Sequence, residues 1–64
     1  MKVIINKKPE ILQDGTLVGE LLKQRDNNRA SVWVNGKQLL KADFATFEIK
    51  DGDEIKIFRI LAGG

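Results

Sequence analysis

Only one segment of this chain carries the apolar stripe of a helix, and this limits the folds open to it. Leu17, Val18, Leu21 and Leu22 fall at i, i+1, i+4 and i+5, so their side chains share one face of a helix over residues 17–25. A helix with one apolar stripe must bury that stripe against another element. Because the 64 residues contain no second stripe of this length, that element has to be a β-sheet.

The residues around the helix have specific local roles. Thr16 is predicted to be the N-cap, because its hydroxyl can accept a hydrogen bond from an N–H group of the first turn. The run Asp26-Asn27-Asn28 is predicted to end the helix. Gly19 costs roughly 1 kcal/mol relative to Ala inside a helix. Either the helix tolerates this cost or another segment packs closely at Gly19.

The remainder of the chain consists of short strand-like runs between turn sequences. Asn6-Lys7-Lys8-Pro9 is predicted to be the turn of an N-terminal hairpin, and Asn35-Gly36 the tight turn of a second hairpin. Asp51-Gly52-Asp53 indicates a further turn. The expected elements besides the helix are one irregular helical turn within residues 41–47 and strands over residues 2–6, 10–12, 30–35, 37–40 and 54–61.

These elements predict an α+β fold with one domain over residues 1–64. The sheet is mixed, has four to five strands, and carries the one main helix on one face. Phe44 and Phe47 are expected to fill the core. Residues 61–64 are expected to form a flexible C-terminal tail.

Alternation along the strands separates the two faces of this sheet. The helix is predicted to cover Val32, Val34, Ile55 and Ile57. Exposed apolar side chains that cluster on a sheet often mark a partner site. The alternative for the two aromatic residues is that they cover an edge of the core. The candidate docking residues on the uncovered face are Trp33, Phe58, Ile60 and Ile4.

Composition excludes several classes of site. The chain has no Cys and no His, which removes disulfides, a thiol nucleophile, an imidazole base and the usual zinc ligand sets. Asp51, Asp53 and Glu54 lack a full cation-binding loop and are interpreted as turn residues. No acid–base or nucleophile set remains, so we expect neither an enzyme nor a bound metal or cofactor.

Charge and hydropathy narrow the possible partners. The net charge is only +2, and the basic residues alternate with nine acids along the chain. Nucleic-acid binding would require a focused basic stripe with stacking aromatics. No apolar run approaches the roughly 20 residues that span a membrane, and no signal peptide is visible. We therefore expect a cytoplasmic protein that binds neither nucleic acid nor a membrane.

The last residues, Gly63-Gly64, follow an apolar run over residues 55–62. Two glycines without Cβ atoms make a thin tail that can enter a narrow active site, and Ala62 extends this slenderness by one residue. The α-carboxylate of Gly64 becomes electrophilic when ATP activates it. The alternative is a frayed terminus that happens to end in glycine.

Three segments together resemble a known family, and they span nearly the whole chain. They are residues 16–22, the run Val32-Trp33-Val34-Asn35-Gly36, and the run from Asp51-Gly52-Asp53-Glu54-Ile55 to Gly64. In this order and at these spacings they resemble the β-grasp (ubiquitin-like) fold. Within that fold they are similar to the ThiS family of sulfur carriers of thiamin biosynthesis, which is related to the small subunit of molybdopterin synthase.

The resemblance implies a mechanism and a set of partners. A ThiF-like adenylyltransferase of the E1 type would use ATP to join Gly64 to AMP. A sulfur donor protein would convert the acyl-adenylate to a thiocarboxylate, and a ThiG-like thiazole synthase would receive the sulfur. The chain would be a protein cosubstrate that binds no cofactor itself. Ubiquitin-like proteins meet such enzymes through the open sheet face. Arg59 and Lys56 flank the tail and could pair with acids of an enzyme. The alternative is that both are ordinary solvated charges.

Other functions with the same sequence features stay open. The chain could carry sulfur for molybdopterin, for a tungsten cofactor or for another product. It could be a ubiquitin-like modifier that is joined to lysines, which would produce conjugates of higher mass. It could also be a β-grasp domain that binds its partner noncovalently, in which case blocking the C-terminus would have no effect.

Overall fold

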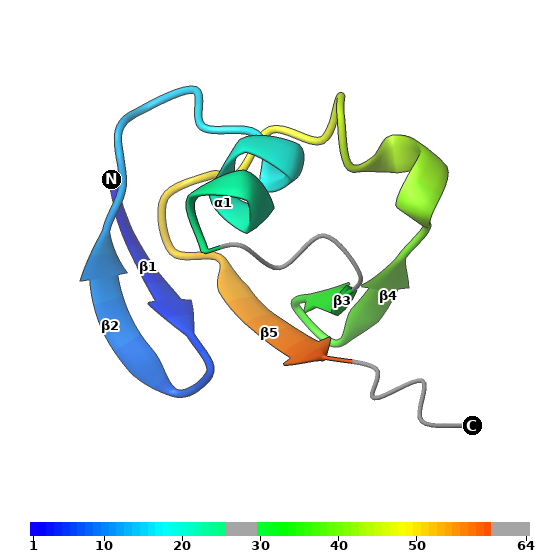
Figure 1. Ribbon diagram of the computed structural model, residues 1–64. Coiled ribbons are helices and arrows are strands. Elements are labelled where there is room, and N and C mark those ends of the chain that lie inside the picture. Colours follow the sequence, from blue (N-terminus) through cyan, green and yellow to red (C-terminus); the bar gives the residue numbers. More distant parts are fainter. Residues whose placement is uncertain (26–29, 60–64) are drawn as a thin grey trace.

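Strands from the two ends of the chain meet at the centre of one sheet. In this computed structural model, which describes residues 1–25 and 30–59, β1 (Lys2–Ile5) lies parallel to β5 (Glu54–Arg59). Within these residues the sheet has five strands in the order β2-β1-β5-β3-β4, and all neighbours except β1 and β5 are antiparallel (Figure 1). This is the mixed sheet of the predicted β-grasp arrangement, with β5 bonded on both sides.

The N-terminal hairpin has a shorter turn than predicted. Ile5 pairs with Lys8, so β2 (Lys8–Ile11) begins inside the expected four-residue turn. Only Asn6 and Lys7 form the loop, with φ of 50° and 68°. Positive φ at both positions is the signature of a type I′ turn, whose twist matches that of the flanking strands. Pro9 is tolerated in β2 because this is an edge strand.

The second hairpin follows the prediction. β3 (Ala30–Val34) and β4 (Lys37–Leu39) are joined by Asn35 and Gly36, with φ of 52° and 84°. These values define another type I′ turn, as the Asn-Gly pair indicates.

The α-helix of the described segments, α1 (Val18–Gln24), packs on one face of the sheet (Figure 1). Its N-cap is Leu17, so the prediction of Thr16 was wrong by one residue. Leu17 is extended because it forms a bridge with Glu48, and this places the start of the helix one residue later. The Thr16 hydroxyl donates instead to the carbonyl of Gln13 at 2.7 Å. The Leu17 N–H donates to Glu20 Oε1 at 3.0 Å.

Gly19 lies where another segment approaches the helix closely. Its N–H donates to the carbonyl oxygen of Phe44 at 2.8 Å, and a Cβ on Gly19 would stand 3.2 Å from the same oxygen. Phe44 follows a short 3-10 helix, η1 (Lys41–Asp43), which is the irregular turn predicted within residues 41–47. Of the two interpretations of Gly19, the structure therefore supports close packing.

The core lies between α1 and the sheet. Alternate residues of β1, β3 and β5 supply most of it, because a strand directs every second side chain to the same face. Phe44 and Phe47 are partly buried against it, as expected. No helix in the two described segments is long and apolar enough to cross a bilayer. The buried core residues are Val3, Ile5, Val18, Leu21, Leu22, Ala30, Val32, Val34, Ile49, Ile55 and Ile57.

Candidate functional site

The sheet face opposite α1 carries an aromatic pair at its centre. Trp33 of β3 and Phe58 of β5 have ring centroids 5.5 Å apart and an interplanar angle of 78°, an edge-to-face arrangement. Trp33 is half-buried and Phe58 is 53% exposed. The structure thus brings together the two aromatic residues that alternation assigned to one face, and it leaves most of Phe58 available to a partner.

Ile4 shares this face but lies away from the aromatic pair. It stands level with Glu54, four residues along β5 from Phe58, and it is 38% exposed. Ile11 of the edge strand β2, opposite Lys2, is 75% exposed on the same face and was not among the predicted docking residues. Its orientation follows from the register of β2, which the sequence left ambiguous. We call the residues Ile4, Ile11, Trp33, Lys56 and Phe58 the open face.

A hollow of about 390 Å³ adjoins the aromatic pair at the end of the sheet where β5 finishes. It lies between the first hairpin turn, Asn6-Lys7, and the stretch of β5 from Lys56 to Phe58, and these five residues line it. Sequence reasoning missed Asn6 and Lys7, because it placed both in a loose four-residue turn. We call this feature the hairpin hollow.

Asn6 fixes the position of this turn over β5. Its main-chain N–H donates to the carbonyl of Ile55 at 2.9 Å, which continues the parallel pairing of β1 and β5. Its side-chain amide then bonds the main chain of Ile57. The side chain of Asn6 is therefore held by the sheet, and the turn is part of the rigid scaffold.

The opposite end of β5 is held by the residues that carried the family resemblance. The Asp53 carboxylate accepts hydrogen bonds from Asn35 Nδ2 at 3.0 Å and from the Lys50 N–H at 2.9 Å. The Glu54 N–H donates to Asn35 Oδ1 at 3.0 Å. The Val-Asn-Gly and Asp-Gly-Asp-Glu motifs thus lock two turns together, so their role within the described residues is structural.

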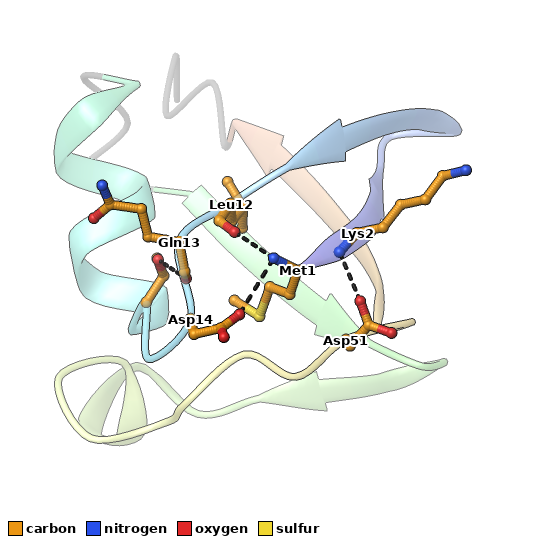
Figure 2. A network of polar contacts seen from close by, with 7 residues as sticks. Met1, Lys2, Leu12, Gln13, Asp14 and Asp51 are labelled. Carbon is orange, nitrogen blue, oxygen red and sulfur yellow. Dashed lines mark hydrogen bonds and ion pairs between the residues drawn. The ribbon is translucent and has the colours of Figure 1, made fainter.

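Asp51 has a similar role near the N-terminus. Its Oδ1 accepts a hydrogen bond from the Lys2 N–H at 2.7 Å, and Figure 2 shows this contact beside the bonds of Met1. The Met1 amino group donates to the carbonyl of Leu12 at 2.7 Å and lies 3.3 Å from Asp14 Oδ1. The interpretation of Asp51 and Asp53 as turn residues is confirmed, whereas Glu54 is the first residue of β5 and was wrongly assigned to the turn. Among residues 1–25 and 30–59, no three acidic side chains come together in a way that could hold a metal ion.

β5 leads toward the predicted sulfur-carrying tail. The last residue of β5, Arg59, pairs with Ala30. The structure describes the backbone of Arg59 but not its side chain. Ile60 and the tail residues Ala62, Gly63 and Gly64 lie outside the described residues, and the expectations for them stay predictions. Phe58, which belongs to the aromatic pair and lines the hairpin hollow, lies six residues before Gly64 in the sequence.

Comparison with known proteins gives a consistent result. The model of the ThiS family matches residues 3–64. The sulfur carrier protein ThiS of Escherichia coli (strain K12) is 30% identical over 66 residues, with 100% of both chains covered. The crystal structure of the thiamine biosynthesis protein ThiS from Geobacter metallireducens has a TM-score of 0.85 and 28% identity, again over 100% of both chains. An NMR structure of a thiamine biosynthesis protein from the same organism has a TM-score of 0.78 and 28% identity, over 100% of this chain and 88% of that one.

Proposed function

This chain belongs to the ThiS family, and we propose that it carries sulfur as a thiocarboxylate on Gly64 for thiazole formation in thiamin biosynthesis. The observation that carries the proposal is the family match, which runs from residue 3 to Gly64 itself. It is supported by the likeness to a sulfur carrier over the full length of both chains. A hydrogen-bonded sheet followed by a terminal Gly-Gly suits such a role, because the sheet would hold the position of the thin tail that delivers the sulfur.

The proposed chemistry has two steps, both in the active site of a ThiF-like adenylyltransferase. The Gly64 carboxylate attacks the α-phosphorus of ATP, and the bond to pyrophosphate breaks to give an acyl-adenylate. Sulfide, or its equivalent from a sulfur donor protein, then attacks the acyl carbon, and the bond to AMP breaks. The products are a C-terminal thiocarboxylate and AMP. The enzyme binds the ATP, and the carrier itself holds no cofactor.

In this scheme the chain is a cosubstrate in the cytoplasm and its partners are the catalysts. The open face is where we propose that the adenylyltransferase docks, since it exposes the aromatic pair near the end of β5 together with the aliphatic side chains of Ile4 and Ile11. β5 is bonded by β1 on one side and β3 on the other. When the sheet is bound to the enzyme, the tail would therefore start from a fixed position. A ThiG-like thiazole synthase would later accept the sulfur from the same tail.

The test is the intact mass of the protein after incubation with ATP, sulfide and the adenylyltransferase of the same organism. We expect a gain equal to the difference between sulfur and oxygen, and fragmentation should locate it at Gly64. The matched control omits ATP and should show no gain. An unchanged mass, under conditions that convert the Escherichia coli carrier with its own enzyme, would overturn the proposal.

The same sample separates the neighbouring functions. Thiocarboxylated protein incubated with a thiazole synthase should lose its sulfur to the thiazole product. Transfer to a molybdopterin precursor instead would make the chain a carrier for that pathway. Conjugates of higher mass joined through lysines would indicate a protein modifier.

A further inference from the structure

Lys7 has a backbone conformation that its residue type disfavours. It occupies the second position of the type I′ turn with φ of 68°. Asn-Gly is the preferred pair in such turns, because glycine adopts positive φ without a steric penalty. The second hairpin of the same protein has this pair, Asn35-Gly36. Outside Gly and Asn, Lys7 is the residue with positive φ in the part of the chain that the structure describes.

The turn itself does not need the lysine side chain. Asn6 makes the side-chain hydrogen bonds that attach the turn to β5, and Lys7 makes none within the described segments. Strained backbone at a position where glycine would serve better points to a use for the side chain. The use has to be sought where that side chain lies, in the wall of the hairpin hollow.

The hairpin hollow combines positive charge with an aromatic surface. Lys7 and Lys56 line it, and no acidic residue does. Within residues 1–25 and 30–59, the ion pairs are Met1 with Asp14 and Arg25 with Glu10, so neither lysine is neutralised there. Lys56 is half-buried directly across from Trp33, and Phe58 forms the adjoining wall. This set suits a carboxylate that lies next to an apolar side chain.

We propose that the hairpin hollow receives an acidic side chain of the adenylyltransferase, with Lys7 and Lys56 holding the carboxylate and Phe58 contacting a neighbouring apolar residue. This inference rests on the proposed function, because it names the chemistry by which the partner recognises the open face. Charge complementarity selects the acidic occupant, since the hollow offers two ammonium groups and no acceptor side chain other than Asn6. In this proposal the Lys7 side chain serves binding, although its positive φ strains the backbone of the turn.

The experiment compares binding of the adenylyltransferase to four forms of the full-length chain, at low and at high salt. The forms are the wild type, Lys7→Gly, Lys56→Gln and Lys50→Gln. Lys50 is the matched control, because its exposed side chain lies in the loop before β5, at the far end of that strand from the hollow. We expect Lys7→Gly and Lys56→Gln each to lose about five- to tenfold in affinity at low salt, mainly through slower association. The losses should shrink at high salt.

Thermal unfolding of the same samples supplies an independent readout. Lys7→Gly should unfold at a higher temperature than the wild type, because glycine relieves the strain of positive φ. Weaker binding by a more stable protein excludes damage to the fold as the cause. Lys50→Gln should match the wild type in both measurements.

The outcomes separate this inference from the proposed function. If the wild type binds and is thiocarboxylated but Lys7→Gly and Lys56→Gln bind equally well, the acidic contact is wrong and the sulfur-carrier function stands. Tighter binding by the two variants would also overturn the inference, because it would mean that the hollow repels the partner or is filled by an acidic group of this chain. If the wild type does not bind the adenylyltransferase, both proposals fall.

Discussion

The side-chain amide of Asn6 pairs with the main chain of Ile57 in both directions. Its Oδ1 accepts from the Ile57 N–H at 2.8 Å, and its Nδ2 donates to the Ile57 carbonyl at 3.3 Å. The main chain turns away from β5 at Asn6, so the side chain supplies the next pair of bonds in place of the backbone. Asn35 anchors the other hairpin turn to β5 in a related way, through Glu54. Each type I′ turn thus begins with an Asn that ties it to the central strand.

The first prediction concerns this anchor. Asn6→Gly keeps the positive φ without strain but removes both bonds to Ile57, leaving a part-buried N–H unpaired. We expect the free energy of unfolding to fall by about 1–3 kcal/mol, measured by urea denaturation. Asn6→Asp retains the acceptor and should lose less. A Gly variant as stable as the wild type would mean that water replaces the amide at no cost.

Gly19 gives a prediction whose sign differs from helix propensity. Helix propensity alone predicts that Gly19→Ala raises the free energy of unfolding by roughly 1 kcal/mol. The added Cβ would lie 3.2 Å from the Phe44 carbonyl oxygen. That segment cannot easily withdraw, because the Phe47 carbonyl also accepts from the Val18 N–H at 3.0 Å. We expect a net loss of about 1 kcal/mol in thermal or urea unfolding. A stabilised variant would show that the loop after η1 yields.

The exposed side chain of Phe58 should contribute more to docking than to the stability of the fold. Because Phe58 is 53% exposed, Phe58→Ala should reduce the free energy of unfolding by only about 0.5–1.5 kcal/mol, the size of an aromatic pair. Binding to the adenylyltransferase should weaken by about 2 kcal/mol or more, as at an interface hot spot. Ile11→Ala is the comparison variant within the open face: Ile11 is 75% exposed on edge strand β2, away from the aromatic pair, so its loss of binding should be smaller, as at the rim of an interface. Calorimetric titration of both variants checks this. Equal losses would move the docking centre toward β2.

The proposed role of the tail gives a further prediction. Gly63→Val adds a β-branched side chain next to the proposed sulfur-carrying residue, so we expect thiocarboxylation to be blocked while the unfolding temperature stays unchanged. Gly63→Ala should be intermediate in rate. Intact mass measured over time, beside thermal unfolding, tests both statements. Normal conversion of the Val variant would refute the idea that the tail must be thin.

The match between sequence and structure depends on how local each feature is. The alternation of Val32, Trp33 and Val34 determines the two sides of β3 in any sheet, because successive side chains of a strand point to opposite faces. Asn35-Gly36 likewise requires positive φ and gives the predicted turn. The Asn6-Lys7 turn was not predicted at its true length, since Lys at positive φ contradicts local preference and is imposed by the pairing of Ile5 with Lys8.

Local sequence patterns were enough to predict the helix after Thr16, the two faces of β3 and β5 and the α+β class, and the motifs indicated the family. These follow from periodicity and turn chemistry, which act over a few residues. The three-dimensional structure was needed to show that Leu17 caps α1, that Gly19 contacts Phe44, and that Lys7, Lys56 and Phe58 line one hollow. Each of these contacts joins residues from different elements. Strand register and helix docking bring these residues together, and no sequence pattern of a few residues specifies such contacts.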